Sequence, residues 1–289
     1  MNKFFLIDKP LWITSFDVIR VLKKKLQIKR IGHTWTLDPL ASWLLLIAVW
    51  NYTKLIPYFE KDTKVYDFEV SLNWKTASYD AETPVEYISE EKQEYFKNNL
   101  KKEDIENILR ANFSWVINQL PPKYSALKIN WNKALDLVRD WVEFELKTRN
   151  IEIFSIEILN YNYPLISLRA KVSAWTYIRS IWNDLWVLLW TWWFVTKLRR
   201  VEIWNLSIDK SITLEDFDEN KSLNIEEILD KNRFLKMDEY MIGRFNNWLV
   251  TNTNISLEEN TDYFVTSDNI NITNIIKYQN KQIVPIRKI

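Results

Sequence analysis

The chain has 289 residues, of which 47% are hydrophobic and 27% charged, and its formal net charge is only +1. This composition predicts a globular protein with one large domain, or a large and a small one, and excludes an intrinsically disordered chain. With no cysteine and a single histidine, His33, the chain has no disulfide framework, thiolate metal site or His-rich metal cluster. The longest apolar runs, 43–50 and 185–195, are shorter than the roughly 20 residues of a membrane span, so we expect a cytoplasmic protein.

Strands and helices are predicted to alternate irregularly along the chain. Residues 4–8 form a strand, and Thr14 with Asp17 makes a capping-box-like start to an amphipathic helix. Residues 64–73 alternate strictly between apolar and polar side chains, which is typical of a half-buried strand. Further strands are predicted at 143–149, 151–160, 165–173 and 201–208, and helices near 103–111, 131–140, 176–188 and 223–231. This order predicts an α+β fold with a largely antiparallel or mixed sheet.

Charge is distributed unevenly, although the net charge is small. The first 30 residues carry eight Lys or Arg against two Asp, whereas residues 209–240 carry ten acidic and five basic residues. A run of like charges most often marks a solvated face, so nucleic-acid binding has to be inferred from local patches. We predict a large domain over 1–208, an acidic helical linker over 209–240 and a small, Asn-rich β domain over 241–289.

The glycine and tryptophan counts are abnormal. A chain of this length normally contains about 20 glycines, but only Gly32 and Gly243 are present, beside 16 tryptophans. Trp12 lies in a turn before a helix N-cap and Trp141 lies at a helix-stop position, where glycine is favoured. A Trp-rich core would instead place indoles on apolar helix and strand faces. We therefore hypothesise that many of these codons are UGA triplets that the native host reads as glycine.

The densest cluster of chemically useful residues lies at 30–44. Asp38 precedes Pro39, which lacks an N–H group and biases the aspartate toward extended backbone, so the carboxylate is held at a loop edge. An aspartate before proline is most often a turn former. Only its neighbours in the sequence make Asp38 a candidate catalytic carboxylate.

Four motifs resemble, in the same order, those of TruB-type tRNA pseudouridine synthases. They are KPLWITS at 9–15, GHTWTLDPLASW at 32–43, QLPPKYSALK at 119–128 and WTYIRS at 175–180. The tryptophans that stand where this family has glycine are Trp12, Trp35, Trp43, Trp115, Trp131, Trp141, Trp175, Trp186, Trp192 and Trp204. The resemblance extends over about 3–208. It implies a pseudouridine-synthase fold, with a central sheet flanked by helices, followed by a small PUA-like β domain.

The resemblance also implies a reaction and its catalytic residues. Uridine 55 in the T-loop of tRNA would be isomerised to pseudouridine without a cofactor or metal, with Asp38 as a nucleophile at the sugar or a base at C2′. Arg179 would pair with this aspartate and hold it ionised, and Tyr66 would stack on the target base and assist its final deprotonation. Without the resemblance, Tyr66 would be a core residue of a strand and Arg179 an ordinary helix-surface arginine.

The same resemblance assigns residues to substrate binding. His33 would help to extrude the target base from the T-loop, and Tyr177 and Leu198 would line the uridine pocket. The basic residues expected to contact phosphates of the T-arm are Lys9, Lys64, Lys197, Arg199 and Arg200, with Lys123, Lys128 and the cluster at 23–30. We expect tRNA as the partner, no membrane, no small-molecule cofactor and a monomeric protein.

Two other functions are left open by the sequence. An RNA-folding chaperone would use the same fold and binding face, although the presence of Asp38, Tyr66 and Arg179 argues against an enzyme that has lost its activity. An RNA-guided homologue of the archaeal or eukaryotic type is disfavoured, because the chain begins almost at KPLWITS and has no long basic tail. Literal Trp35 and Trp175 would crowd the active-site loop and Arg179, so we expect poor folding and little activity of the chain as written.

Overall fold

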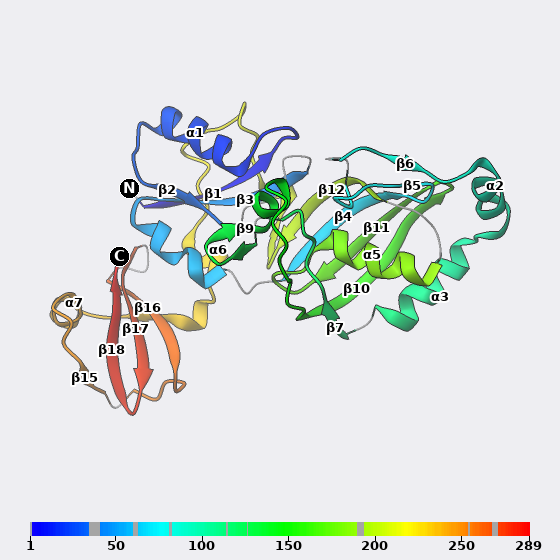
Figure 1. Ribbon diagram of the computed structural model, residues 1–289. Helices are drawn as coiled ribbons and strands as arrows, with labels where there is room; N and C mark the ends of the chain where they lie inside the picture. Colours follow the sequence, from blue (N-terminus) through cyan, green and yellow to red (C-terminus); the bar gives the residue numbers. More distant parts are fainter. Residues whose placement is uncertain are drawn as a thin grey trace.

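The protein is described from a computed structural model (Figure 1). The residues it describes are 2–34, 41–59, 63–80, 83–113, 115–125, 127–189, 194–253, 255–267 and 271–289, with the backbone alone over 185–189. Asp38 and Trp35 lie outside these ranges. The described chain forms a large mixed sheet with helices, followed by a smaller sheet, which confirms the predicted α+β class. None of the helices in these ranges is long and apolar enough to cross a membrane.

The larger sheet has nine strands and its main path runs β1-β3-β12-β4-β11-β10-β7, with β2 paired to β3 and β13 to β12. The strands are β1 (Lys3–Lys9), β2 (Ile31–His33), β3 (Ser42–Val49), β4 (Lys64–Ser71), β7 (Trp115–Gln119), β10 (Arg149–Asn162), β11 (Leu165–Val172), β12 (Phe194–Ile203) and β13 (Leu206–Ser207). Neighbouring strands are antiparallel except β12 and β3. That parallel contact pairs Arg199 with Ser42, so the start of β3 lies beside the middle of β12.

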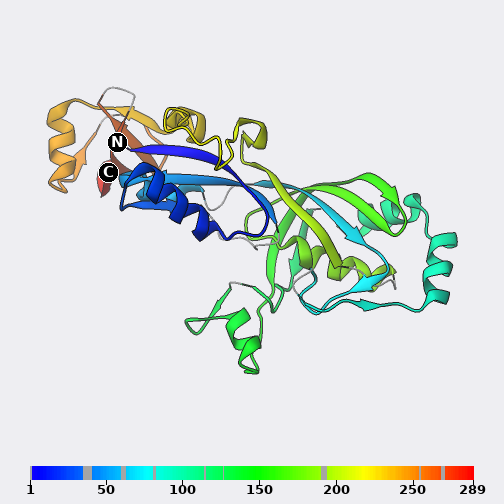
Figure 2. The same cartoon turned by 90° about the horizontal axis from the view of Figure 1, so that it is seen from above.

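The helices are α1 (Ser15–Leu26), α2 (Glu90–Asn99), α3 (Lys102–Asn112), α4 (Ala134–Arg139), α5 (Ile178–Leu189), α6 (Ile225–Ile228) and α7 (Glu239–Asn246), with 3₁₀ helices η1 (Trp50–Phe59), η2 (Ile208–Lys210) and η3 (Lys231–Arg233). Helices α1, α3 and α5 contribute buried apolar side chains to the core of the large sheet, whereas α7 packs on the C-terminal sheet. The capping box of α1 is confirmed, with Thr14 and Asp17 bonded reciprocally. Two short hairpins, β5 (Trp74–Lys75) with β6 (Glu86–Tyr87) and β8 (Lys128–Ile129) with β9 (Asn132–Lys133), lie outside this sheet. Figure 2 shows the segment containing β9 and α4 projecting from the body.

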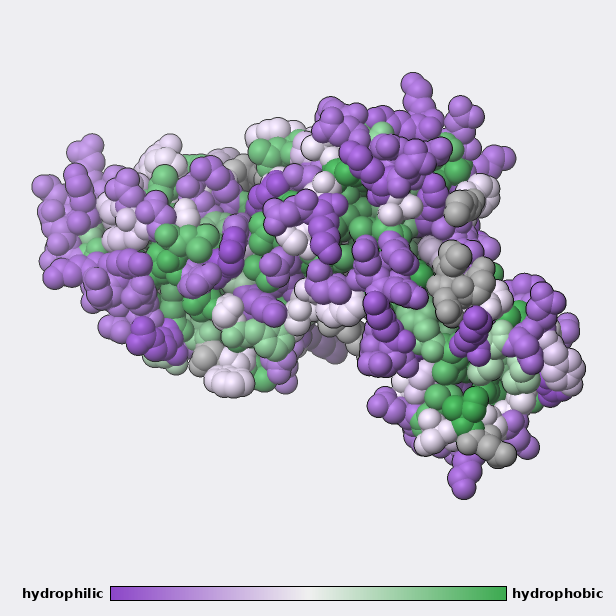
Figure 3. Space-filling view, turned by 180° about the vertical axis from the view of Figure 1, so that it is seen from behind, coloured by the Kyte–Doolittle hydropathy of each residue, from purple (hydrophilic) through white to green (hydrophobic). Residues whose placement is uncertain are grey.

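The C-terminal part of the chain forms a five-stranded sheet in the order β14-β16-β17-β18-β15. Its strands are β14 (Phe234–Lys236), β15 (Thr251–Asn252), β16 (Thr261–Thr266), β17 (Ile272–Gln279) and β18 (Gln282–Lys288). Phe264 and Ile275 of this sheet share one buried cluster with Tyr52 and Leu55 of η1, which attaches the two parts to each other. From behind, this part stands out as a separate lobe (Figure 3). Its first strand, β14, falls inside the segment predicted as a linker.

Two stretches differ from the predicted elements. Residues 142–148 form neither strand nor helix, so the strand predicted at 143–149 is wrong except for its last residue, where β10 begins. The strand predicted at 201–208 begins earlier, because β12 starts at Phe194 and contains Arg199 and Arg200. Pairing of β12 with both β3 and β4 decides this conformation, and local sequence does not report such tertiary pairing.

The tryptophans divide into two classes by backbone conformation. Of the 16, Trp35, Trp190, Trp192 and Trp193 lie outside the described residues, which leaves twelve. Those with left-handed backbone are Trp12, Trp50, Trp115, Trp131, Trp141, Trp175, Trp204 and Trp248, with φ from 53° to 74°. All eight are exposed, whereas Trp43 and Trp182 lie in the core. Left-handed backbone costs a residue with a side chain about 1–2 kcal/mol, and glycine adopts it freely.

Two of these tryptophans occupy the helix-termination site that most favours glycine. At the end of α4, the Trp141 N–H donates to the carbonyl of Val138 at 3.2 Å and the Val142 N–H to that of Leu137 at 3.0 Å. At the end of α7, Trp248 donates to Phe245 and the next N–H to Arg244, both at 3.0 Å. Each pair of bonds is a Schellman motif with tryptophan at C′, the residue that is usually glycine.

Exchange of an exposed left-handed tryptophan is expected to stabilise the protein. Trp141→Gly should raise the free energy of unfolding by about 1 kcal/mol, because glycine removes the steric cost at C′. Trp182→Gly, which empties a buried site in α5, should lower it by more than about 3 kcal/mol. Urea unfolding of both variants beside the parent measures the two changes. Equal losses of stability would show that the backbone at Trp141 carries no strain.

Candidate active site

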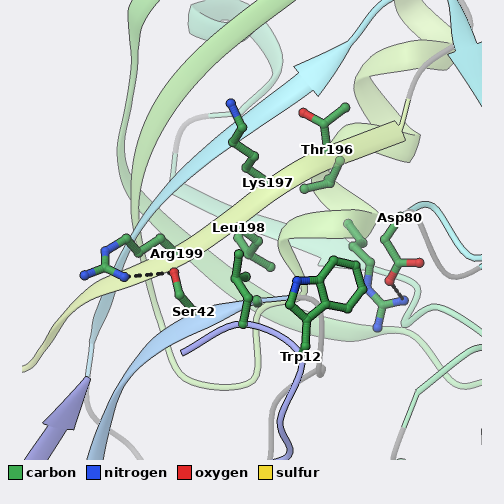
Figure 4. Close-up of a pocket in the computed structure, with 11 residues that line it drawn as sticks. Trp12, Ser42, Asp80, Thr196, Lys197, Leu198 and Arg199 are labelled. Carbon is green, nitrogen blue, oxygen red and sulfur yellow. Dashed lines mark hydrogen bonds and ion pairs between the residues drawn. The ribbon is translucent and has the colours of Figure 1, made fainter. Parts of the chain in front are cut away.

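A pocket of about 260 Å³ opens where several segments far apart in the sequence meet (Figure 4). Leu11 and Trp12 from the turn after β1, Ala41 and Ser42 at the start of β3, and residues 195–199 of β12 line it together with Asp80 and Arg179. Leu11 and Trp12 are exposed, whereas Asp80 and Arg179 are buried. The pocket therefore leads from an apolar rim to a charged base.

Arg179 forms the charged base of the pocket from the first turn of α5, and it is only 3% exposed. Its guanidinium pairs with the Asp80 carboxylate, Nη1 to Oδ2 at 2.8 Å, and donates to the carbonyls of Ser78 and Tyr124 at 3.0 Å each. The Ser78 hydroxyl donates to the other Asp80 oxygen at 2.7 Å. A buried charge is tolerated only when it is paired and hydrogen-bonded. This network consequently fixes three chain segments around the pocket before any ligand arrives.

Asp80 was missed by the sequence analysis, which paired Arg179 with Asp38. Asp38 lies outside the described residues, so that contact stays a prediction. Because a guanidinium has five N–H donors, a contact with Asp80 does not preclude one with a second carboxylate. Asp80 follows a polar stretch typical of a turn, and no spacing in the sequence distinguishes it. Only the folded chain brings it to Arg179.

Tyr177 is held by its backbone from a neighbouring strand. The buried side chain of Gln119 in β7 donates to the Tyr177 carbonyl at 3.0 Å and accepts from the Tyr177 N–H at 2.9 Å. Arg149, which pairs with Gln119 across the sheet, lies with its guanidinium carbon 4.7 Å from the centre of the Tyr177 ring. Burial lowers the pKa of this guanidinium. Tyr177 is not among the described residues that line the pocket. Its two bonds with Gln119 instead hold the backbone just before α5, next to Arg179 in the first turn of that helix.

Tyr66 and Leu198 occupy different environments in the structure. Leu198 lines this pocket, whereas Tyr66 is 5% exposed in the core of the large sheet. Trp43 packs edge-on against Tyr66, with ring centres 6.3 Å apart, and also lies 5.4 Å from the Arg200 guanidinium. The Trp43 indole therefore covers the tyrosine that was predicted to stack on the target base.

Three of the basic residues predicted to contact phosphates, Lys9, Lys64 and Arg200, are buried. The Lys9 ammonium donates to the carbonyls of Pro10 and Ile13 at 2.8 and 2.7 Å, and Arg200 donates twice to the Leu44 carbonyl at 3.1 and 2.6 Å. Lys64 is 4% exposed at the start of β4. Burial lowers the pKa of the Arg200 guanidinium. In this conformation Lys9 and Arg200 bond to backbone carbonyls, and the contacts of all three residues with RNA stay predictions.

Arg199 differs from these buried cations because it lies at the rim of the pocket. It pairs with Asp8, Nη2 to Oδ2 at 2.7 Å, and donates to the Ser42 hydroxyl at 2.9 Å (Figure 4). The neighbouring Lys197 is 75% exposed and pairs with Glu69. Arg199 and Lys197 are thus the pocket-lining cations whose side chains are exposed to solvent.

His33 ends β2, opposite Ile47 of β3, and is half-buried. Residues 35–40 follow, and the described chain resumes at Ala41 on the wall of the pocket. Within the described residues, no three His, Asp or Glu side chains gather as metal ligands would.

The sequence was compared with known families and proteins. The model of the TruB family pseudouridylate synthase N-terminal domain matches residues 23–178. The chain belongs to this family. It is 35% identical to tRNA pseudouridine synthase B of Clostridium tetani, over 83% of this chain and 82% of that protein. It is 38% identical to the Clostridium kluyveri protein of the same name, over 83% and 82%, and 36% identical to that of Mycoplasma mobile, over 79% and 76%.

Solved structures show the same fold at low sequence identity. One, of an H/ACA RNP bound to a substrate RNA containing 2′-deoxyuridine, aligns with a TM-score of 0.72 at 16% identity and covers 99% of this chain and 84% of that chain. Another, of a Cbf5-Nop10-Gar1 complex, aligns with a TM-score of 0.73 at 17% identity with the same coverage. The pseudouridine-synthase fold expected for this TruB-family chain is therefore confirmed over its whole length.

The buried Asp80–Arg179 pair is expected to matter far more for stability than an exposed pair. Asp80→Ala leaves an uncompensated buried cation and should lower the free energy of unfolding by about 3–5 kcal/mol. The matched control is Asp67→Ala, which breaks the solvent-accessible pair with Arg169 and should cost about 1 kcal/mol or less. Chemical unfolding measures both. Similar losses in the two variants would contradict the anchoring role of Asp80.

Proposed function

We propose that this chain isomerises uridine 55 in the T-loop of tRNA to pseudouridine. The observation that carries the proposal is the pocket of a TruB-family chain, where a buried guanidinium faces an apolar wall formed by Val195 and Leu198. An apolar wall with one charged group suits a flat, polar-edged base. The relatives named tRNA pseudouridine synthase B support tRNA as the substrate.

The chemistry requires a carboxylate but no redox partner. The bond between C1′ and N1 of uracil breaks, a bond between C1′ and C5 forms, and the proton that C5 then loses is balanced by the proton that N1 gains. We assign the carboxylate to Asp38, acting either as a nucleophile at C1′ or as a base at C2′. Ala41, which closely follows Asp38 in the sequence, lines the pocket, and this supports the assignment.

The other groups of the site prepare this reaction. In the proposal Arg179 donates to Asp38 and favours its ionised form, while Asp80 keeps the guanidinium in place. The target base has to leave the T-loop to reach Asp38, and His33 fills the space that the base vacates. Tyr66 stacks on the face of the base once the base has entered the pocket, and this role requires that the Trp43 indole be absent.

The RNA is proposed to dock by the T-arm on a monomer. Arg199 and Lys197 at the rim and the basic cluster at 23–30 contact phosphates, whereas Lys9, Lys64 and Arg200 support the backbone of the site. The C-terminal sheet serves as the PUA-like RNA-binding domain. A cytoplasmic location follows from this substrate.

Asp38→Asn is expected to abolish the reaction while leaving RNA binding in place. In protein whose eight left-handed tryptophans, Trp35 and Trp43 are replaced by glycine, T-arm RNA should gain one pseudouridine at position 55, and the same protein carrying Asp38→Asn should form less than about a thousandth as much. Mass-spectrometric mapping of pseudouridine measures this. Unchanged pseudouridine formation would refute the role of Asp38. Refolding of tRNA, followed in parallel, identifies a chaperone if that activity is the only one found.

We also propose that the native host inserts glycine at many positions written as tryptophan, by reading UGA as glycine. Support comes from the left-handed backbone at six of the ten family-glycine positions: Trp12, Trp115, Trp131, Trp141, Trp175 and Trp204. Trp50 and Trp248 are left-handed as well. Trp35 and Trp192 lie outside the described residues, and Trp43 and Trp186 lie in β3 and α5 without left-handed backbone.

The gene provides the direct check of this reassignment. The codons for the eight left-handed tryptophans should be TGA, and peptides isolated from the host should carry glycine at these positions. TGG codons there, or tryptophan in the peptides, would end the proposal.

A further inference from the structure

The turn between β1 and α1 directs one side chain across the entrance of the pocket. Trp12 lines the pocket at its exposed side, with 75% of its surface accessible. Figure 4 shows its indole standing between Leu198 on one side and the Asp80–Arg179 pair on the other. A nucleotide that remains attached to its RNA has to pass this indole to reach Arg179.

The backbone of the turn restricts the direction in which the Trp12 side chain extends. Lys9 is fully buried, and its ammonium stabilises the turn by donating to the carbonyls of Pro10 and Ile13 on either side of Trp12. The Thr14–Asp17 capping box follows at once, with the Thr14 N–H bonded to the Asp17 carboxylate at 2.9 Å. With φ of Trp12 fixed at 69°, the Cα–Cβ bond points at the pocket, and only rotation about χ1 and χ2 moves the indole.

An indole is itself a flat aromatic group that covers as much area as a nucleobase. Its position against Leu198 is the position in which a uracil ring entering from solvent would make its first apolar contact. The indole and the base therefore compete for one surface, and the entrance accommodates one of them. Glycine at position 12 would remove this competitor and relieve the left-handed backbone in the same step.

We infer that residue 12 is the steric gate of the nucleotide pocket, which admits a flipped nucleotide when the residue is glycine and excludes it when it is tryptophan. This inference rests on the proposed function, because it takes the flipped nucleotide as the ligand. It also distinguishes Trp12 from the other left-handed tryptophans. Trp248 has the same backbone conformation, with φ of 61°, but it lies at the end of α7 in the C-terminal part.

The test compares three proteins that differ only at these two positions. All three have glycine at positions 35 and 43. The first also has glycine at all eight left-handed sites, the second keeps Trp12 as its one left-handed tryptophan, and the third keeps Trp248 instead. The second and third thus carry one strained indole each, so folding is matched between them. Each protein is titrated with a T-arm hairpin containing uridine at position 55 and with the same hairpin carrying an abasic nucleotide there.

Retention of Trp12 should weaken binding of the uridine hairpin by about tenfold or more and leave binding of the abasic hairpin within about twofold. Retention of Trp248 should change neither affinity beyond the same margin. Equal weakening of both hairpins by Trp12, or no weakening, would overturn the gate.

Pseudouridine formation separates the two proposals. If the all-glycine protein shows the base-dependent affinity but forms no pseudouridine, the proposed function fails and the gate stands. If the Trp12 protein converts RNA as fast as the all-glycine protein, the gate fails and the function stands.

Discussion

The buried charge of Arg179 is the constraint on which the site depends. A guanidinium out of contact with water has to be paired and fully bonded, and here its partners come from the 78–80 segment and from Tyr124. Meeting this requirement brings the start of α5, the turn after β5 and the segment after β7 to one point. The central position of β12, between β3 and β4, supplies the apolar wall opposite. The charge of Arg179 is thus held in one orientation by the protein itself.

Left-handed backbone is the second constraint, and it acts on the whole chain. Eight of the described tryptophans have a backbone conformation that glycine takes without cost, and each of these indoles is exposed. At about 1–2 kcal/mol each, these sites together equal the entire stability of a typical domain. Trp12 has a second effect besides its backbone strain, because its indole also obstructs the entrance of the pocket. Trp43 acts differently, because its buried indole fills the space next to Tyr66.

Local patterns in the sequence predicted much of the sheet and one helix in detail. The α1 capping box, the alternating β4 and the long strands β10 and β11 follow from spacing alone. The motif resemblance located Arg179 and Leu198 at what proves to be one pocket.

Asp80 was not predictable, because nothing near it in the sequence reveals its distant partner. Nor was the burial of Lys9, Lys64 and Arg200, since their partners include backbone carbonyls that only the folded chain presents. Arg199 and Arg200 lie in a strand because β3 and β4 pair with it.

The central claim is that a uridine leaves its loop and enters the pocket between Leu198 and the Asp80–Arg179 pair. A crystal structure of the glycine-restored protein carrying Asp38→Asn, bound to a T-arm hairpin, tests it most directly. We expect the target uracil in that pocket, unstacked from its neighbours and occupying the place of the Trp12 indole. A uracil still stacked within the loop, or bound elsewhere while the pocket holds only solvent, would contradict the account.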